Sequence, residues 1–428
     1  MQSEPERLKA FRQLRIDIRG SERHLIVGID IAKDKHYAFC GTANGKTLCK
    51  QIVFPNSKEG FELLTSRVEV VRVKHQLDHV IFGLEPTANY HKPLAEYLIR
   101  QGLQLVLVSG NSVKKNRELL DNRWDKHDRK DAANVADLMA QGKCLFYDYP
   151  KESIRDLREL LSLKRKLKQH AHGLKTRIRN NLLALYFPEM DHFMNTCQQD
   201  NLAVVGTSCS PMLIAGMEYD TFKAQVACVR KGKIQDEHLY KIWQCAKNSI
   251  GCNSGVAAAY EGQILVKQLQ ETTAAYQELD KLILQLCSGL EEYPYLLSIP
   301  GIGPDTASKI LAYVSDPNRF DHEKQVLKLA GFDLCASRSG GSSAKATPVI
   351  SKRGQADLRY ALCQAALVAS TCNAFFCTWF AKKLQGRERE KGIFSVIRVK
   401  LAAKMLVIAW TLMKKKEMFA YEGHLNNS

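Results

Sequence analysis

Four acidic residues in the N-terminal part of the chain have the spacing expected of a carboxylate cluster. Asp30 ends the apolar run HLIVGI, and Glu85 ends a second apolar run, HVIFGL. Asp128 and Asp131 are three residues apart in KHDRKDAANVADL, so they share one face of a predicted helix. A carboxylate at the end of a buried strand is rigidly supported, as a metal ligand of a phosphoryl-transfer enzyme must be.

Divalent cations would be needed to hold four such side chains together. Two like charges about 4 Å apart repel by about 4 kcal/mol at an effective dielectric constant of about 20. Oxygen ligands suit Mg²⁺ or Mn²⁺, and two ions would bind the attacking and leaving oxygens of a phosphodiester. Simpler interpretations are a turn at Asp30 and a helix cap or a solvated face for Asp128 and Asp131. Asp34 and Asp125 are close enough in sequence to replace one of the four.

The segments around these residues predict an α/β domain. Runs of Val, Ile and Leu predict strands, and Asn44-Gly45 between two of them predicts a hairpin. The predicted order is strands at residues 25–29, 36–42 and 46–54, a helix at 57–75, a strand at 79–84, a helix at 92–101, a strand at 103–108, and helices at 110–120 and 128–141. This order is typical of a ribonuclease H-like fold, in which Asp30 and Glu85 end neighbouring strands.

The composition of the chain limits its partners. It has 428 residues, 45% of them hydrophobic, and a formal net charge of +17, which favours a polyanion such as nucleic acid or an anionic membrane surface. No run of 18 apolar residues is present, and the charged N-terminus lacks a signal-peptide core, so we expect no membrane span. Thirteen cysteines without a CxxC pair argue against a zinc site or a disulfide framework and favour a reducing cytoplasm.

Two long helical patterns, at residues 151–186 and 257–290, predict an antiparallel arm or coiled coil that could support oligomerisation. The first is basic, since residues 151–180 contain ten lysines and arginines against three aspartates and glutamates. We expect this helix to bind nucleic-acid phosphates. The candidate residues are Lys164, Lys168, Lys175 and Arg179. The alternative is a solvated, lysine-rich face, and the poorly periodic residues 187–254 predict no function.

The segment LLSIPGIGPDTASKILAYV has the form of a helix-hairpin-helix. Gly301 and Gly303 would let backbone N–H groups approach a DNA phosphate at the start of the second helix. The alternative is a tight turn that serves only the packing of two helices.

A segment rich in serine and glycine follows and contains Ser337 and Ser339, ahead of the basic residues Lys352 and Arg353. A serine there could attack a phosphodiester, because nearby cations would stabilise the developing charge. Composition alone favours a flexible linker.

These motifs together resemble the DEDD-type transposases of bacterial insertion sequences, the bridge-RNA-guided recombinases that also include Piv-type DNA invertases. The resemblance covers nearly the whole chain. It rests on GIDIAKDKH, Glu85, DRKDA, the FPE at residues 187–189, IPGIG with the later Arg319-Phe320, and the ordered series AGF, SRSGG, ISKRG and LR. One departure is SSAKATPV, which is less basic and less glycine-rich than usual in the family.

The resemblance implies an α/β plus α fold in several parts. After a lead-in at residues 1–23 come a RuvC-like (ribonuclease H-like) domain at 24–148, a helical coiled-coil arm with an insertion at 149–292, and a helical C-terminal transposase domain with a helix-hairpin-helix at 293–428. The implied DEDD ligands of Mg²⁺ or Mn²⁺ are Asp30, Glu85, Asp128 and Asp131.

The resemblance also implies a reaction and its partners. The family's nucleophilic serine precedes the glycine of an SG pair, which here is Ser339, with Ser337 as the nearby competitor. It would form a covalent phosphoserine link to a DNA strand, assisted by carboxylates of another protomer, before strand exchange through a Holliday-junction-like intermediate. The implied partners are element and target DNA, a noncoding bridge RNA and further copies in a homodimer or homotetramer, without a membrane, at the nucleoid in the bacterial cytoplasm.

Two other functions compete with this one. A Holliday-junction nuclease would use only the metal site and water, so Ser339→Ala would be harmless and no adduct would form. A non-catalytic DNA- or RNA-binding protein with a degenerate nuclease fold would keep every activity after Asp30→Ala. The intact set of four carboxylates argues against this last function.

Overall fold

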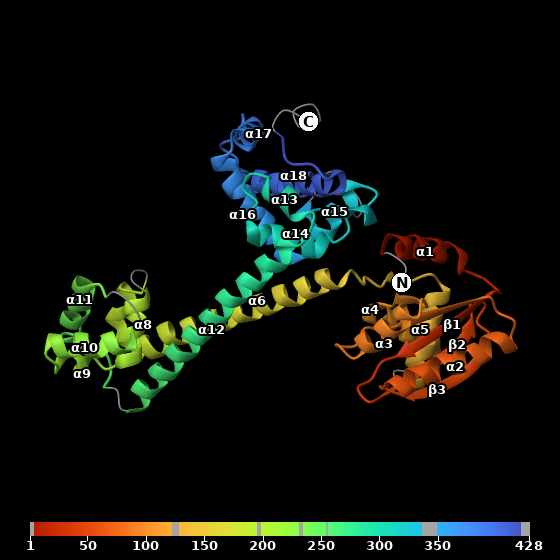
Figure 1. Ribbon diagram of the computed structural model, residues 1–428, viewed down its shortest axis with the longest axis horizontal. Coiled ribbons are helices and arrows are strands. Elements are labelled where there is room, and N and C mark those ends of the chain that lie inside the picture. Colours follow the sequence, from red (N-terminus) through yellow and green to blue (C-terminus); the bar gives the residue numbers. More distant parts are fainter. Residues whose placement is uncertain are drawn as a thin grey trace. The chain divides into compact units, whose positions relative to one another are not determined.

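The computed structural model describes residues 4–121, 128–194, 198–230, 234–253, 256–335 and 349–420 (Figure 1). The chain forms two compact units. Unit 1 comprises Met1–Lys151 and Asp316–His322, and unit 2 comprises Glu152–Ser315 and Glu323–Ser428.

Unit 1 is built on a six-stranded sheet in the order β3-β2-β1-β4-β5-β6. β1 pairs antiparallel with β2 and parallel with β4, and β4 pairs parallel with β5. The strands are β1 (His24–Asp30), β2 (Lys35–Thr42), β3 (Thr47–Pro55), β4 (His79–Leu84), β5 (Gln104–Leu107) and β6 (Leu145–Phe146). The ribonuclease H-like order predicted from the sequence is confirmed. The sequence does not predict β6, because two residues carry no periodic pattern.

Helices cover both faces of this sheet. They are α1 (Glu4–Asp17), α2 (Lys58–Lys74), α3 (His91–Arg100), α4 (Gly110–Asp121) and α5 (Asp128–Ala140). The odd-numbered residues of β1 join a core shared with α2 and α3, whereas Ile26 joins a second core shared with α1, α4 and α5. Because successive side chains of a strand alternate between faces, Gly28 and Asp30 face the α5 side.

Local sequence signals fix the ends of two elements in unit 1. Gly45, in the turn between β2 and β3, has a φ of +81°, which suits the glycine of an Asn-Gly hairpin. Ser57 caps α2, because its hydroxyl accepts a hydrogen bond from the Gly60 N–H at 3.3 Å.

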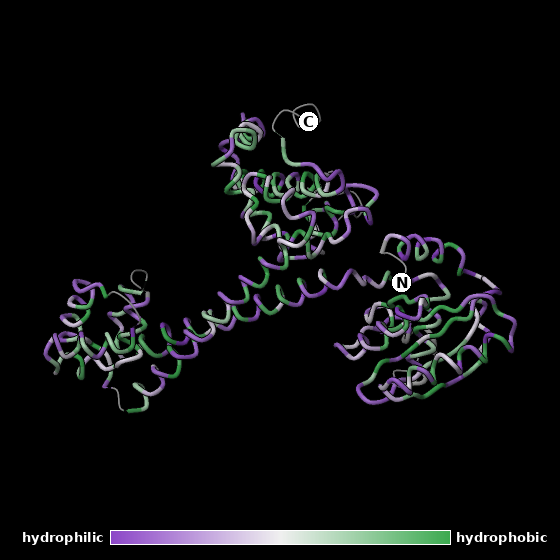
Figure 2. The backbone as a smooth tube through the Cα atoms, viewed as in Figure 1, coloured by the Kyte–Doolittle hydropathy of each residue, from purple (hydrophilic) through white to green (hydrophobic). Residues whose placement is uncertain are grey.

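Two long helices, α6 (Glu152–Arg177) and α12 (Val256–Ser288), pack along each other in unit 2, and we call this pair the arm. The two helices run in opposite directions, because Arg177 pairs with Glu261 and Lys164 pairs with Asp280 (Figure 1). Figure 2 shows α6 as largely hydrophilic, in contrast to the hydrophobic strands of unit 1.

The chain leaves α6 through a π-helical segment, Ile178–Leu183, and then α7 (Ala184–Tyr186). Five short helices follow: η2 (Pro188–His192), α8 (Gln198–Thr207), α9 (Pro211–Ala215), α10 (Tyr219–Val229) and α11 (Asp236–Ala246). They share with the arm a core that includes Phe187, Met190 and Phe222. The poorly periodic part of the sequence is therefore folded, in helices too short to show a clear period.

The C-terminal part of unit 2 is helical around α18. Its helices are α13 (Tyr293–Leu297), α14 (Pro304–Val314), α15 (Glu323–Ala330), α16 (Ala356–Cys372), α17 (Ala374–Leu384) and α18 (Ile393–Lys415). β7 (Leu334–Cys335) and β8 (Val349–Ile350) form a two-stranded antiparallel ladder. Within the described residues no single helix is long and apolar enough to cross a membrane. Among these residues, only α16 and α17 taken together have that length and apolar composition, and they meet at an angle of 97°.

Candidate active site

The strand ends of unit 1 bring two of the predicted carboxylates to one edge of the sheet. The last paired residues of the parallel strands β1 and β4 are Ile29 and Leu84. Asp30 and Glu85 each come directly after this pair, and both are half-buried. The two carboxylates therefore stand on neighbouring strands at the carboxyl edge, as the sequence predicted.

Two glycines place α5 directly above these strand ends. Gly28 and Gly83 pair with each other across β1 and β4, and each lies two residues before its acid. A Cβ atom on Gly28 would lie 2.2 Å from the Ala132 carbonyl oxygen, and one on Gly83 would lie 2.1 Å from the Met139 sulfur. The backbone of α5 can approach β1 this closely only because Gly28 has no side chain, and the absence of a side chain at Gly83 leaves room for Met139. Sequence reasoning missed this role, although the repeated spacing Gly-Ile-Asp and Gly-Leu-Glu could have revealed it.

The third predicted carboxylate is carried by α5. Asp131 is only 3% exposed, and it adjoins Ala132, whose carbonyl meets Gly28. Asp131 therefore lies near the last residues of β1, on the face of the sheet toward which Asp30 points. Asp128 is the first residue of α5, and its side chain lies outside the described residues, as does Asp125.

The start of α4 provides a partner for Glu85. A Cβ atom on Gly110, the first residue of α4, would lie 2.7 Å from Oε1 of Glu85, so the carboxylate rests against the helix N-terminus. Backbone N–H groups and the helix dipole stabilise negative charge there. The sequence offers a weak signal for this contact, a glycine two residues after a buried strand.

His36 supports the turn that follows Asp30. Its side chain is fully buried, and its Nδ1 accepts a hydrogen bond from the Ala32 N–H at 3.3 Å. The imidazole also packs edge-on against Phe54. Burial lowers the pKa of His36, so the neutral ring that can accept this hydrogen bond is favoured.

The carboxylates fit a divalent cation in chemistry but do not form a closed site by themselves. Asp30, Glu85 and Asp131 offer only oxygen donors, on one face of the sheet and at one edge, which suits Mg²⁺ or Mn²⁺. In the part of the chain that the structure describes, no three Asp, Glu, His or Cys side chains are grouped so as to hold a metal ion. The described residues thus provide the supporting frame of such a site.

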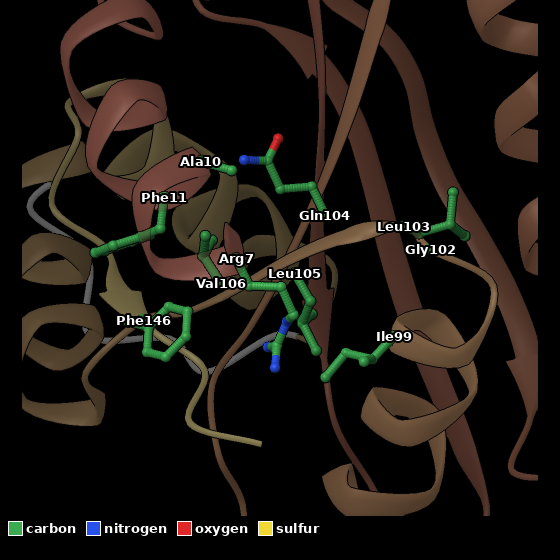
Figure 3. Close-up of a pocket in the computed structure, with 10 residues that line it drawn as sticks. All are labelled: Arg7, Ala10, Phe11, Ile99, Gly102, Leu103, Gln104, Leu105, Val106 and Phe146. Atoms are coloured by element: carbon green, nitrogen blue, oxygen red, sulfur yellow. The ribbon is translucent and has the colours of Figure 1, made fainter. Parts of the chain in front are cut away.

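A pocket of about 220 Å³ in unit 1 lies elsewhere (Figure 3). Arg7 lines the pocket and connects α1 to the segment around β6. Its guanidinium donates to the Tyr147 carbonyl oxygen at 2.8 Å and lies 5.3 Å from the Phe146 ring centroid. Gly102 and Gln104 also line the pocket, and they lie at the start of β5. This is the amino end of the parallel strands, whereas Asp30 lies at their carboxyl end. The pocket is therefore separate from the carboxylates.

The basic residues predicted on the first arm helix have different surroundings. Lys168 and Lys175 are exposed, and Arg179 pairs with Asp191. The prediction that Lys164 binds phosphate is corrected: this lysine is buried, and its Nζ lies 2.5 Å from Asp280 and 2.7 Å from Asp305. Helical periodicity places a lysine on a face but does not identify what packs against that face.

The two glycines of the predicted hairpin also differ. Gly301 has a φ of +86°, and a Cβ atom there would lie 2.6 Å from the Ala365 carbonyl oxygen. It therefore allows α16 to pack against the turn, and the approach of DNA to the backbone at Gly301 stays a prediction. Gly303 precedes the first residue of α14, and none of the described residues lies within 4 Å of its Cβ position.

Both candidate serines, Ser337 and Ser339, lie outside the described residues. The ladder of β7 and β8 pairs the residues on either side of that segment, Cys335 with Val349. Lys352 and Arg353 follow β8 and are exposed.

The FPE sequence at residues 187–189 has a structural role that sequence reasoning did not identify. Phe187 is fully buried, and the Glu189 carboxylate accepts hydrogen bonds from the Ser249 hydroxyl at 2.6 Å and the Ile250 N–H at 2.9 Å. These contacts fix η2 against the loop that follows α11.

Comparison with known proteins identifies two relatives that each match about a third of the chain. A Moraxella lacunata protein described as a pilin gene-inverting protein is 28% identical over 153 residues, 34% of this chain and 46% of that protein. A probable family 20 transposase of Pseudomonas aeruginosa is 28% identical over 155 residues, 36% of this chain and 45% of that protein. The chain thus matches about half the length of these relatives.

Two family profiles match separate parts of the chain. A transposase profile of the DEDD IS110 type matches residues 27–188, which include Asp30, Glu85, Asp128 and Asp131. The profile of the transposase IS116/IS110/IS902 family matches residues 293–378, which include Ser339. The two matches cover more than half of the chain, and the protein belongs to the IS110-type family of DEDD transposases.

Proposed function

We propose that this protein is a site-specific DNA recombinase, the transposase of a bacterial insertion sequence. The observation that carries the proposal is the pair of glycines, Gly28 and Gly83, that brings α5 over the strand-end acids Asp30 and Glu85. This arrangement supports a rigid carboxylate site at one edge of a ribonuclease H-like sheet. Rigid ligands are what metal-assisted phosphoryl transfer requires.

The four carboxylates would hold Mg²⁺ or Mn²⁺. The ligands are Asp30, Glu85, Asp128 and Asp131. Bound divalent cations neutralise charge on a phosphodiester and favour displacement at its phosphorus. The chain's own contribution is positional: α4 stabilises the charge of Glu85, and His36 fixes the turn after Asp30.

Ser339 is the proposed nucleophile. Its Oγ forms a bond to phosphorus, the bond from phosphorus to a deoxyribose oxygen breaks, and the hydroxyl proton ends on that leaving oxygen. The exposed cations Lys352 and Arg353 after β8 support this role, because they would stabilise the phosphate charge. Reversal of the step on a second strand would give strand exchange without loss of bond energy.

The remaining features are assigned to nucleic acid and assembly. Lys168, Lys175, Arg179 and the open turn at Gly303 bind phosphates, and a noncoding bridge RNA selects the DNA sites by base pairing. The antiparallel pair α6 and α12 acts as a coiled-coil arm in a homodimer or homotetramer. Carboxylates and serine then come together from different protomers, in the bacterial cytoplasm.

Covalent trapping tests the proposal directly. The protein would be mixed with Mg²⁺, RNA transcribed from the element's flanks and end-labelled DNA spanning the element junction, then denatured and separated on a protein gel. We expect a labelled adduct that is lost in Ser339→Ala and in Asp30→Ala but is retained in Ser337→Ala. Cutting without an adduct, abolished only by Asp30→Ala, would instead establish a metal-dependent nuclease. An adduct lost only in Ser337→Ala would move the nucleophile to that serine.

A further inference from the structure

A polar groove of about 770 Å³ lies in unit 2 where the basic helix α6 ends. Its walls come from the last turns of α6, the π-helical segment and η2. The polar residues that line it are His172, Lys175, Thr176, Arg179, Asn180 and Asp191. The function proposed above assigns Lys175 and Arg179 to phosphate binding but gives no role to the groove itself.

A basic stripe on α6 leads into the groove. Lys168, His172, Lys175 and Arg179 are spaced by four, three and four residues, so they lie on one side of the helix. The first three are exposed, whereas Leu174 is buried. The stripe extends over about 16 Å at the rise of an α-helix. A linear polyanion matches such a stripe better than a single small anion.

The π-helical segment allows this side to stay open at the end of α6. Ile178, Leu182 and Leu183 are buried in the core of unit 2, whereas Arg179 and Asn180 remain at the surface. The wider π turn thus buries three apolar residues without turning the arginine inward. Single π turns inside α-helices occur frequently at functional sites.

Arg179 is held in one orientation by a carboxylate. Its Nε and Nη2 atoms donate to the two oxygens of Asp191, with Nη2 3.0 Å from Oδ2. The hydrogen bond from Arg179 lowers the pKa of Asp191, so the carboxylate stays charged and the pair is neutral as a whole. This side-on pairing leaves the Nη1 hydrogens for a second anion.

Contacts of the neighbouring residues fix the position of Asp191. It belongs to η2, which is anchored through Phe187 and through the hydrogen bonds of Glu189 with Ser249 and Ile250. An arginine oriented before its ligand arrives loses less conformational entropy on binding than a mobile one.

We propose that this groove binds the phosphodiester backbone of a single nucleic-acid strand, with Arg179 gripping a phosphate through its Nη1 edge and Lys175 neutralising the next one. The inference rests on the nucleic-acid role assigned to the arm above. It adds a specific site in which the FPE sequence and Asp191 position an arginine that acts by geometry as well as by charge.

The chain offers a matched control for Arg179. Arg177 lies two residues earlier and is also a surface arginine paired with a carboxylate, Glu261, at 2.7 Å. It does not line the groove. Arg177→Ala and Arg179→Ala therefore remove the same charge from the same helix end.

The test is binding of the full-length protein to fluorescent 12-nucleotide single strands, measured by anisotropy without Mg²⁺, with one DNA and one RNA series. We expect Arg179→Ala to weaken binding at least tenfold and Arg177→Ala less than twofold. Arg179→Lys should not restore affinity, because lysine lacks the planar fork. The slope of log affinity against log salt should fall by about 0.7 per lost phosphate contact in Arg179→Ala. If Arg179→Ala loses affinity only for the DNA series or only for the RNA series, that result identifies the kind of strand that occupies the groove.

Asp191→Ala separates geometry from charge. If only net charge matters, removal of this acid tightens binding. If Arg179 acts through its fixed orientation, binding weakens severalfold although the net charge has risen. Equal losses in the two arginine variants, or tighter binding by Asp191→Ala, would overturn the proposal. Circular dichroism melting verifies the fold of each variant, and the assay is independent of strand cutting, because the strands carry no element junction and no metal is present.

Discussion

At the scale of single residues, Gly28 and Gly83 determine how closely the helix with Asp131 can approach the strands with Asp30 and Glu85. Neither glycine is needed for a positive φ, and both are needed for space. The neighbour of Gly28 is backbone, the Ala132 carbonyl, whereas the neighbour of Gly83 is the flexible side chain of Met139. Gly28 is therefore the stricter position of the two.

Gly28→Ala should destabilise unit 1 and abolish strand cutting. The added methyl group would force α5 away from β1, which costs about 1–3 kcal/mol in a well-packed core. The displacement would also separate Asp131 from Asp30. Urea unfolding gives the change in stability, and covalent trapping gives the change in activity.

Gly173→Ala is the matched control for that substitution. Gly173 lies within α6, and no atom of the described part of the chain outside that helix lies within 4 Å of its Cβ position. Alanine there should therefore be neutral or stabilise the protein by up to about 1 kcal/mol. Wild-type stability in Gly28→Ala would show that α5 can shift without cost, and the role given to the glycine pair would be wrong.

At the scale of elements, Lys164 joins three helices of unit 2. Its ammonium group bonds Asp280 on α12 and Asp305 on α14. Lys164→Met should cost about 1–3 kcal/mol of unfolding free energy, because the carboxylates of Asp280 and Asp305 would lose the cation that they both bind. Lys166→Met, an exposed change on the same helix, should stay within about 0.5 kcal/mol of wild type.

This contact should also make stability depend on pH. Burial raises the pKa of Asp305, but hydrogen bonds from Lys164 and Lys309 outweigh it, so the folded pKa lies below its ordinary value. The stabilisation is thus fully present above the unfolded pKa of about 4 and is lost as pH falls through the folded value. As pH falls below about 4, the free energy of unfolding, measured with denaturant, should decrease less in Lys164→Met than in wild type. Parallel losses would exclude this carboxylate as the source.

Much of the fold and part of the site could be predicted from the sequence. Strand alternation and strand-end acids predicted the sheet order and the positions of Asp30 and Glu85, because both follow from local periodicity. The surroundings of Lys164 and Gly301 could not be predicted, since they depend on helices distant in sequence that pack against them. The π-helical segment and the two-residue β6 also escaped, because neither has a period of its own.

At the scale of the whole molecule, two compact units with separate cores predict a local response to metal. Free Mg²⁺ at about 100 times its dissociation constant would stabilise the folded site by about 2.7 kcal/mol. Hydrogen exchange should therefore slow in β1, β4 and α5 and remain unchanged in α10, α12 and α18. Asp30→Asn should abolish the effect, and NaCl of equal ionic strength is the control. Equal slowing in both units would indicate a general salt effect and not a site.

Unit 1 is discontinuous in sequence, and this affects the order in which its contacts can form during synthesis. Asp316–His322 belongs to unit 1, where Asp321 pairs with Arg12 and Arg319 pairs with Asp148. During synthesis, the sheet with Asp30 and Glu85 can form early, because the N-terminal part of a chain emerges first. These two ion pairs, however, have to wait until the ribosome has passed residue 322. A nascent chain released before that point would carry the carboxylates in an unfinished unit, without the segment that contains the candidate serines.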